Sequence, residues 1–251
     1  MTPTAYLEQL ARLQTVFGRL TEDTDLEATV PGLGGWRVRE LVLHLAGVHY
    51  WAAGMALGDS SRSDELAADP GLDAAALAAL YTEHADALRA TLAAAGPDGA
   101  ARTLVGPGTA SFWYRRQVHE TLVHLGDLAA ARSGAWTPDV LDGVVDLDPG
   151  LWVDGVDEVV TMFEPRQVRL GRIAPLGRLV ELRDAVTGAS WVLGGHEDDR
   201  SAADAPVATA TGEARSLDLV LWGRVTPAAA GVVVDGDAGA LDAALAAGVT
   251  P

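Results

Sequence analysis

Four long segments with helical periodicity fill the first half of the chain, and this feature limits its fold more than any other. Over residues 5–20, for example, apolar side chains recur at three- and four-residue steps from Tyr6 and Leu10 onward, which is typical of an amphipathic helix. Glycine and proline between the segments, as in PGLGG at 31–35, are expected to end each helix. The predicted helices cover residues 5–20, 37–57, 73–95 and 109–132. Four helices of this length predict an antiparallel bundle whose interior can hold ligands.

The second half of the chain, from about Pro149, mixes short strand-like runs with helices. Residues 178–185 and 190–195 flank Thr187-Gly188 and therefore predict a hairpin. The other predicted elements are strands at 206–212 and 231–237 and helices at 213–224 and 238–248. This mixture is typical of an α+β domain, and it contains neither the GxGxxG nor the GxxxxGKS/T phosphate loop.

Glycine, proline and aspartate gather over residues 134–150, between the helical half and the mixed half. We place the domain boundary in this segment because these residues favour turns over regular structure. The predicted organisation is an N-terminal four-helix bundle at residues 1–140, followed by a smaller α+β domain at residues 150–251.

The composition narrows the possible classes of protein. The 251 residues carry 18 Lys+Arg against 35 Asp+Glu, a net charge of −17, which argues against electrostatic binding to nucleic acid or to anionic membranes. Hydrophobic residues make up 49% of the chain, which excludes a disordered protein. The opening residues lack the pattern of a secretory signal, and no apolar run is long enough to span a bilayer. We therefore expect a cytoplasmic protein with no nucleic-acid and no membrane partner.

Two residue types that often carry chemistry are missing. Cysteine is absent, so the chain has no disulfide, no thiolate zinc site and no cysteine nucleophile of its own. All 18 basic residues are arginine, and asparagine is absent as well as lysine. A GC-rich bacterial genome explains this bias, because lysine and asparagine have A/T-rich codons. Only arginines at defined positions therefore inform on function.

The spacing of Glu120 and His124 in the fourth predicted helix is the strongest local hint of a site. Residues four apart lie on one helix face, so this carboxylate and this imidazole can reach a common point. His44, on the apolar stripe of the second predicted helix, can supply a third ligand. A His-Glu-His set suits a divalent metal such as zinc and leaves positions open for water or substrate. The competing interpretation is an ordinary helix pair beside a buried histidine satisfied by a hydrogen bond.

The remaining four histidines are less suited to this site. His49 and His119 point about 100–140° away from the neighbouring candidates when placed on ideal helices of about 3.6 residues per turn. His84 and His196 lie in polar sequence and are expected on solvated surfaces.

Two of the helical segments read GWRVRELVLHLAGVHYWA and FWYRRQVHETLVHLGDLAAARSG. They resemble the mycothiol-dependent maleylpyruvate isomerase family, whose N-terminal domain is a DinB-like bundle. The resemblance implies a metal triad of His44, Glu120 and His124, the trio that the spacing also favours. Arg116 lies four residues before Glu120, where it can hold the carboxylate or orient the ligand. Asp127 can accept the second N–H of His124, although a solvated helix acid is the alternative.

The resemblance extends to the second domain. The segments ATGEARSLDLVLWGRV and VVVDGDAGALDAAL look like the C-terminal domain of the same family, so the likeness covers nearly the whole chain. It implies a role in activity for Arg224, at the end of the first of these segments. The alternative is a cation that stabilises a helix C-terminus by about 0.3–1 kcal/mol.

The family's chemistry fits a chain without cysteine. The resemblance implies that the thiol is borrowed from mycothiol, and that a bound metal, taken here as zinc, deprotonates it. The thiolate then adds to the cis double bond of maleylpyruvate, and rotation followed by elimination yields fumarylpyruvate.

Two other functions remain open. A mycothiol S-transferase in natural-product biosynthesis or detoxification would use the same metal and thiol on another electrophile. A non-catalytic sensor or regulator, of the anti-sigma type for instance, would bind a metal or small molecule without turnover. Thiol chemistry distinguishes these classes, because an enzyme turns over an electrophile with mycothiol, whereas a sensor binds without turnover.

Overall fold

The structure, a computed structural model, describes residues 1–195 and 205–251, and the chain divides into two compact units. The first unit runs from Met1 to Leu147 and is helical apart from one short hairpin. The second unit, Asp148–Pro251, contains a four-stranded sheet with helices. The prediction of a helical N-terminal part and a smaller C-terminal part with a sheet is therefore confirmed.

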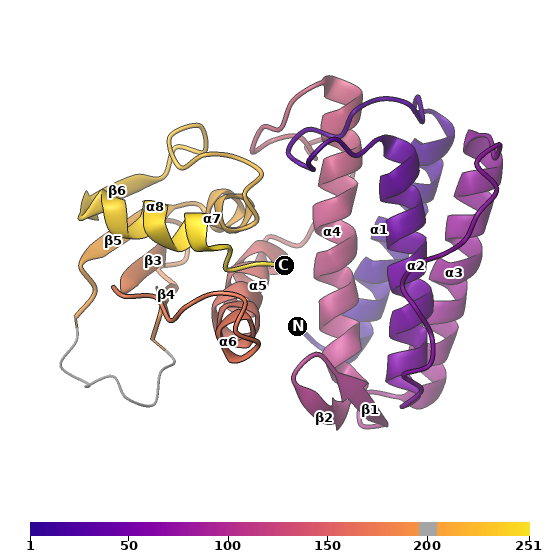
Figure 1. Cartoon of the computed structure of the whole chain (residues 1–251), viewed down its shortest axis with the longest axis horizontal. Helices are drawn as coiled ribbons and strands as arrows, with labels where there is room; N and C mark the ends of the chain where they lie inside the picture. Colours follow the sequence, from indigo (N-terminus) through magenta and orange to yellow (C-terminus); the bar gives the residue numbers. More distant parts are fainter. Residues whose placement is uncertain (196–204) are drawn as a thin grey trace. The chain divides into compact units, whose positions relative to one another are not determined.

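Four long helices build the first unit (Figure 1). They are α1 (Pro3–Glu22), α2 (Val38–Ala56), α3 (Ala74–Ala95) and α4 (Ser111–Ser133). Helices α1 and α2 each pack against both α3 and α4. Fully buried Leu10, Phe17, Leu45, Leu88 and Leu122 lie in the core of this unit. The apolar periodicity of the sequence is thus used to bury one face of each helix.

Local signals at the helix ends explain why these segments begin and stop where they do. The Thr2 hydroxyl accepts a hydrogen bond from the Ala5 amide, and the Asp73 carboxylate caps α3 in the same way. Glycines that adopt positive φ follow α3 and α4, with φ of 67° at Gly96 and 84° at Gly134. These caps lie within a few residues of the ends that the sequence predicted.

A short antiparallel hairpin between α3 and α4 was not predicted. It consists of β1 (Ala100–Thr103) and β2 (Gly106–Thr109), with Ala100 opposite Thr109. Its second strand reads GPGT, in which Thr109 is the single residue that favours a strand and the other three are glycine and proline. The sequence pattern therefore carried little signal here.

The second unit begins with a helical segment that the sequence analysis did not place. It comprises α5 (Gly150–Glu158), the π-helical turn η1 (Val159–Phe163) and α6 (Glu164–Arg169). In the π turn the Glu164 amide donates to the Val159 carbonyl, five residues back. Pro165, which has no amide hydrogen to donate, is the second residue after this turn. Glycine and proline interrupt the helical pattern and so hide this helix in the sequence.

The sheet of the second unit has the order β4-β3-β5-β6. Its strands are β3 (Val180–Asp184), β4 (Ser190–Leu193), β5 (Ala208–Gly212) and β6 (Val233–Gly236). The hairpin predicted across Thr187-Gly188 is confirmed, since β3 and β4 pair antiparallel with Val180 opposite Leu193. Strand β5 pairs parallel to β3 and antiparallel to β6.

Two helices pack against this sheet. Helix α7 (Ala214–Leu221) contacts β3 and β5, and α8 (Ala238–Ala247) contacts β5. Val180, Leu182, Ala208 and Ala210 are buried, whereas the residues that alternate with them in β3 and β5 are partly or fully exposed. This period of two is expected of strands with one covered face.

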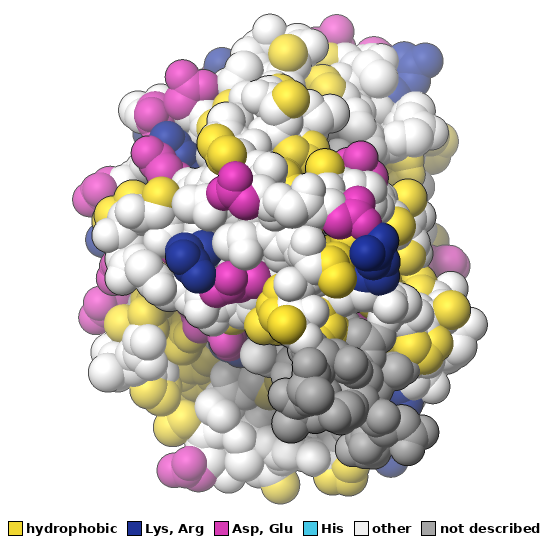
Figure 2. Space-filling view, turned by 90° about the vertical axis from the view of Figure 1, so that its left-hand side faces the viewer, with side chains coloured by type: hydrophobic (Ala, Val, Ile, Leu, Met, Phe, Trp, Pro, Cys, Tyr) yellow, Lys and Arg dark blue, Asp and Glu magenta, His cyan; other side chains and the backbone are white. Residues whose placement is uncertain are grey.

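Basic and acidic side chains lie interspersed on the face of the molecule shown in Figure 2. Within the second unit, Arg178 pairs with Asp237, and the Arg183 Nη2 lies 2.8 Å from the Glu181 carboxylate. Among the described residues, no helix is both long and apolar enough to cross a lipid bilayer.

Candidate metal centre

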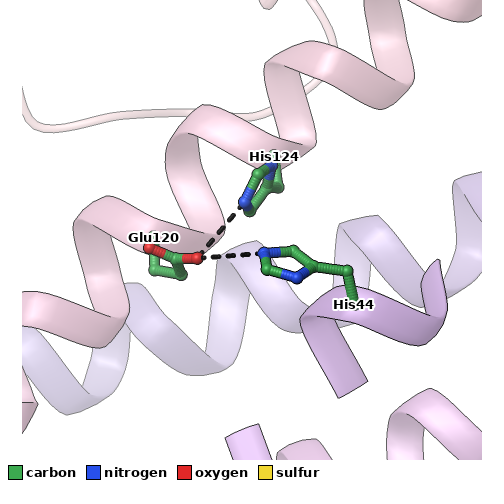
Figure 3. A group of neighbouring side chains, drawn as sticks. All are labelled: His44, Glu120 and His124. Atoms are coloured by element: carbon green, nitrogen blue, oxygen red, sulfur yellow. Dashed lines mark ion pairs between the residues drawn. The ribbon is translucent and has the colours of Figure 1, made fainter. Parts of the chain in front are cut away.

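Helices α2 and α4 bring three potential metal ligands together inside the first unit (Figure 3). His44 comes from α2, while Glu120 and His124 lie one turn apart on α4. The Glu120 Oε1 is 3.6 Å from the His44 Nε2 and 3.2 Å from the His124 Nε2. The ligand atoms of all three residues lie within 4.8 Å of one another.

The three side chains differ in how far solvent reaches them. The side chain of His44 is 32% exposed, against 15% for Glu120 and 11% for His124. His44 also meets the edge of the Trp36 ring, with ring centroids 5.1 Å apart. The two ligands on α4 are therefore largely buried, and His44 on α2 is the most exposed of the three.

The orientation of His124 is set by Asp127, one turn further along α4. The Asp127 Oδ2 lies 2.9 Å from the His124 Nδ1, and Asp127 itself is fully buried. An ionised carboxylate can only accept, so the Nδ1–H of His124 donates this hydrogen bond. The bond turns Nε2 toward Glu120, as in the carboxylate–histidine pairs that support bound metals. Asp127 is thus buried against His124 and is not a solvated helix acid.

Charge around Glu120 keeps its carboxylate ionised. Burial by itself raises the pKa of Glu120, but the charge of the adjacent Arg116 guanidinium and the attraction of the nearby His124 and His44 imidazoles outweigh it. The pKa therefore lies well below its ordinary value. Arg116 pairs with Oε2 of Glu120 and leaves Oε1 directed at the histidines. A cation held by His44 and His124 would therefore also meet a negatively charged oxygen of Glu120.

The pKa of His124 is raised, whereas that of Glu120 is lowered. Burial by itself lowers the pKa of His124, but the hydrogen bonds to Asp127 and Glu120 and the charges of both carboxylates raise it to about 9. A group that binds a proton this tightly also binds other cations well, provided that the cation can replace the proton.

The donor set fits a divalent transition metal. Two imidazole nitrogens and one carboxylate oxygen are the ligands that zinc takes in catalytic sites with an open fourth position. The set contains no thiolate, which agrees with a chain without cysteine. His44, Glu120 and His124 would hold the ion, and among the described residues they form the single cluster with this geometry.

Most of the other histidines lie away from this cluster. His49 is fully buried, with its Nε2 3.1 Å from the Gln14 Nε2 and its Nδ1 2.7 Å from the Gln117 Oε1. His119 is buried elsewhere on α4, and His84 is half-buried against the Tyr50 ring. His84 is thus less solvated than its polar sequence suggested. The remaining histidine, His196, lies outside the described residues.

Arg224 lies in the second unit, just after α7. Its Nη1 donates to the Trp222 carbonyl at 2.7 Å, and its amide donates to the Leu219 carbonyl at 2.9 Å. These contacts place it at the C-terminal end of the helix, which fits a helix-end cation as well as a substrate ligand.

Two tryptophans that lie close to the centre were not identified as site residues from the sequence. Trp36 contacts His44, and Trp136 donates from its indole N–H to the Asp127 Oδ1 at 3.1 Å. Trp36 belongs to the family pattern but was given no role of its own. The sequence feature that could have indicated Trp136 is Gly126, because a glycine inside a helix, where no turn requires it, points to a close neighbour.

Comparisons with known proteins agree with these features. The family model described as "Mycothiol maleylpyruvate isomerase N-terminal domain" matches residues 6–129, and the "MDMPI C-terminal domain" matches residues 151–243. No curated protein sequence gives a significant match to the chain.

Two solved structures share the fold. The crystal structure of the mycothiol-dependent maleylpyruvate isomerase superposes with a TM-score of 0.64 at 15% identity, covering 94% of this chain and 95% of that one. A histidine-to-alanine mutant of that isomerase gives a TM-score of 0.65 at 14% identity, with the same coverage. Both domain matches occur in the family's order and together account for most of the sequence. The chain therefore belongs to the mycothiol-dependent maleylpyruvate isomerase family, which is a family of enzymes.

Proposed function

We propose that this chain is a metal-dependent enzyme that uses mycothiol as its thiol cosubstrate. The observation that carries the proposal is the convergence of His44, Glu120 and His124, whose ligand atoms lie within 4.8 Å of one another. The family membership supports mycothiol as the thiol. We also propose that residues 1–140 act as a DinB-like antiparallel four-helix bundle and residues 150–251 as the C-terminal domain.

His44, Glu120 and His124 would hold a divalent ion, which we propose to be zinc, and this ion would lower the pKa of a thiol bound to it and so supply a thiolate at neutral pH. The protein's residues set up the place where this happens. Arg116 holds one oxygen of Glu120, and Asp127 holds the Nδ1 of His124. Since the chain has no cysteine, the nucleophile has to enter from solution together with the substrate.

The proposed reaction is most simply the cis–trans isomerisation of maleylpyruvate to fumarylpyruvate, or that of a related unsaturated acid. The thiolate sulfur bonds to one carbon of the double bond, the π electron pair moves onto the conjugated carbonyl, and the remaining single bond rotates. Loss of the same sulfur restores the double bond and the free thiol, so no other reactant is consumed. Arg224 is the proposed ligand for a substrate carboxylate, and a local arginine is needed because a net charge of −17 repels an anion.

Calorimetric titration of mycothiol into zinc-loaded protein tests this proposal. We expect binding to the loaded protein and none to a sample stripped with a chelator, and a His44→Ala variant treated with zinc should behave like the stripped sample. Turnover of maleylpyruvate with mycothiol then identifies the isomerase. Consumption of mycothiol into a stable conjugate would instead identify an S-transferase.

Binding of metal without any binding of mycothiol would contradict the proposal. That result would favour a sensor or another metal-dependent reaction.

A further inference from the structure

The indole ring of Trp136 lies directly against α4 at Gly126, in the segment that follows the helix. A Cβ placed on Gly126 would come within 2.1 Å of the Cη2 of Trp136 and 2.9 Å of its Cζ3. Any side chain larger than hydrogen at position 126 would therefore push the ring away. Glycine inside a helix costs about 0.5–1 kcal/mol relative to alanine, so this close approach accounts for a residue that the helix disfavours.

The position of the ring aims its N–H at a buried carboxylate. The Trp136 Nε1 lies 3.1 Å from the Oδ1 of Asp127, which is fully buried. The indole nitrogen can only donate, so Trp136 is the donor of this hydrogen bond and Asp127 is the acceptor. The other oxygen, Oδ2, lies 2.9 Å from the His124 Nδ1. The carboxylate is thus held between the indole on one side and the imidazole on the other.

A single line of contacts therefore connects Trp136 with the proposed metal ligand. A rotation of the Asp127 carboxylate would carry Oδ2 away from the Nδ1 of His124. It would thereby release the orientation that keeps Nε2 of His124 at 3.2 Å from the Glu120 Oε1. Outer partners of this kind contribute to metal affinity because they restrict the ligand to its binding geometry.

We infer that Trp136 is a positioning residue for His124, acting through Asp127, and that Gly126 is there to admit its ring. This inference rests on the proposed function, since it concerns a ligand of the proposed metal. It predicts that zinc affinity depends on a side chain that touches neither the metal nor the substrate.

Two variants and one matched control test the inference. Trp136→Phe keeps an aromatic ring over Gly126 but removes the N–H donor, and Gly126→Ala displaces the ring while favouring the helix. Trp113→Phe is the control, because its indole N–H donates to the Arg102 carbonyl at 2.7 Å instead of to Asp127. Zinc affinity is measured by competition with a chromophoric chelator. Solvent exchange of the His124 Nδ1–H is measured by NMR in stripped protein.

We expect zinc to bind about tenfold more weakly to Trp136→Phe, the lower end of the effect of outer-shell changes, and at least as weakly to Gly126→Ala. The His124 Nδ1–H should exchange faster in both variants, whereas Trp113→Phe should match the wild type in both measurements. Wild-type affinity and exchange in folded Trp136→Phe and Gly126→Ala would overturn the inference.

The two proposals fail in different ways. If the wild type bound no zinc, the proposed function would fall, and the exchange of the His124 Nδ1–H alone would decide the role of Trp136. Faster exchange in the variants would support that role, and unchanged exchange would refute it.

Discussion

The Nε2 of His124 lies 3.2 Å from the Oε1 of Glu120, the residue one turn earlier on α4. The same oxygen is 3.6 Å from the Nε2 of His44 on α2. One carboxylate oxygen therefore faces both imidazoles, and its attraction to the proton of His124 is part of what raises the pKa of that histidine. A metal ion that binds here has to take the place of this proton.

Zinc binding should therefore release a proton and strengthen with pH. The pKa of His124 is raised to about 9, so stripped protein carries the proton below that pH. Glu120 contributes no proton, since its pKa is lowered well below the ordinary value. We expect the apparent Kd for zinc to fall about tenfold per pH unit between about pH 7 and about pH 9. Calorimetry in two buffers of different protonation enthalpy measures the released proton, and a pH-independent Kd would contradict this origin.

Removal of His44 should abolish tight zinc binding without disturbing the fold. His44→Ala deletes one of three ligands, and we expect zinc affinity to fall by more than about tenfold, the loss that outer-shell changes already produce. Helix content should stay the same because alanine favours helices. His84→Ala is the control, since His84 is half-buried against Tyr50 on another part of the unit. Zinc stoichiometry by mass spectrometry of the native protein and far-UV circular dichroism distinguish these results. Equal zinc loading of both variants would remove His44 from the site.

Loss of Arg116 should destabilise the stripped protein much more than loss of an exposed arginine. Arg116 is 3% exposed at its side chain and pairs with the largely buried Glu120. Arg116→Met leaves this carboxylate without its guanidinium, which we expect to cost about 3 kcal/mol in the free energy of unfolding.

Arg12→Met is the matched control for this measurement. Arg12 pairs with Asp146 at side-chain exposures of 47% and 96%, so its loss should cost less than about 1 kcal/mol. Urea unfolding of both variants gives the comparison. Similar losses would show that the Arg116–Glu120 pair contributes no more than a surface pair.

Protonation of His49 should weaken the fold in acid. Burial lowers the pKa of this histidine from 6.5 to about 4, and its hydrogen bond with Gln117 only partly opposes that. Between these pH values the unfolded chain binds a proton that the folded chain does not, so stability falls as the pH is lowered through this range. The full effect is about 3 kcal/mol and is reached near the folded pKa. His49→Gln should lose less stability between about pH 7 and about pH 4 than the wild type does. Equal pH slopes in urea unfolding would assign the acid sensitivity to other groups.

Arg224 should matter for turnover but not for metal loading. Loss of a charge-assisted hydrogen bond to a substrate carboxylate costs about 1.5–3 kcal/mol, so we expect Arg224→Ala to lower kcat/KM for maleylpyruvate by about tenfold or more. Arg183→Ala is the control, because Arg183 pairs with Glu181 on the sheet. Zinc content should equal that of the wild type in both variants. An unchanged rate in Arg224→Ala would leave this residue as a cation that stabilises the end of α7.

Much of the fold could be predicted because its signals are local. The second helix, predicted over residues 37–57, is observed over Val38–Ala56, since its apolar periodicity and its end signals lie within the segment itself. The hairpin of β1 and β2 could not be predicted, because Gly106, Pro107 and Gly108 resemble a loop. Strand pairing with Ala100–Thr103 is what makes these residues a strand.

In the candidate site, too, some residues could be predicted from local spacing and others could not. Glu120 and His124 share a helix face by their spacing alone, and Asp127 follows one turn later. The choice of His44 over His49 as the third ligand depended on ideal helical angles and on the family pattern. The structure shows His49 between Gln14 and Gln117, a position given by the packing of α1, α2 and α4.

By itself, the sequence determined where the four long helices of the first unit run, which face of α4 carries Glu120 and His124, and that any thiol must come from outside the chain. These properties follow from neighbours along the chain or from composition. Only the tertiary structure decided that His44 reaches the same carboxylate oxygen as His124, and that Trp136 lies over Gly126 to hold Asp127. The physical reason is that both contacts depend on how side chains pack between elements, and no pattern within a single element specifies that distance.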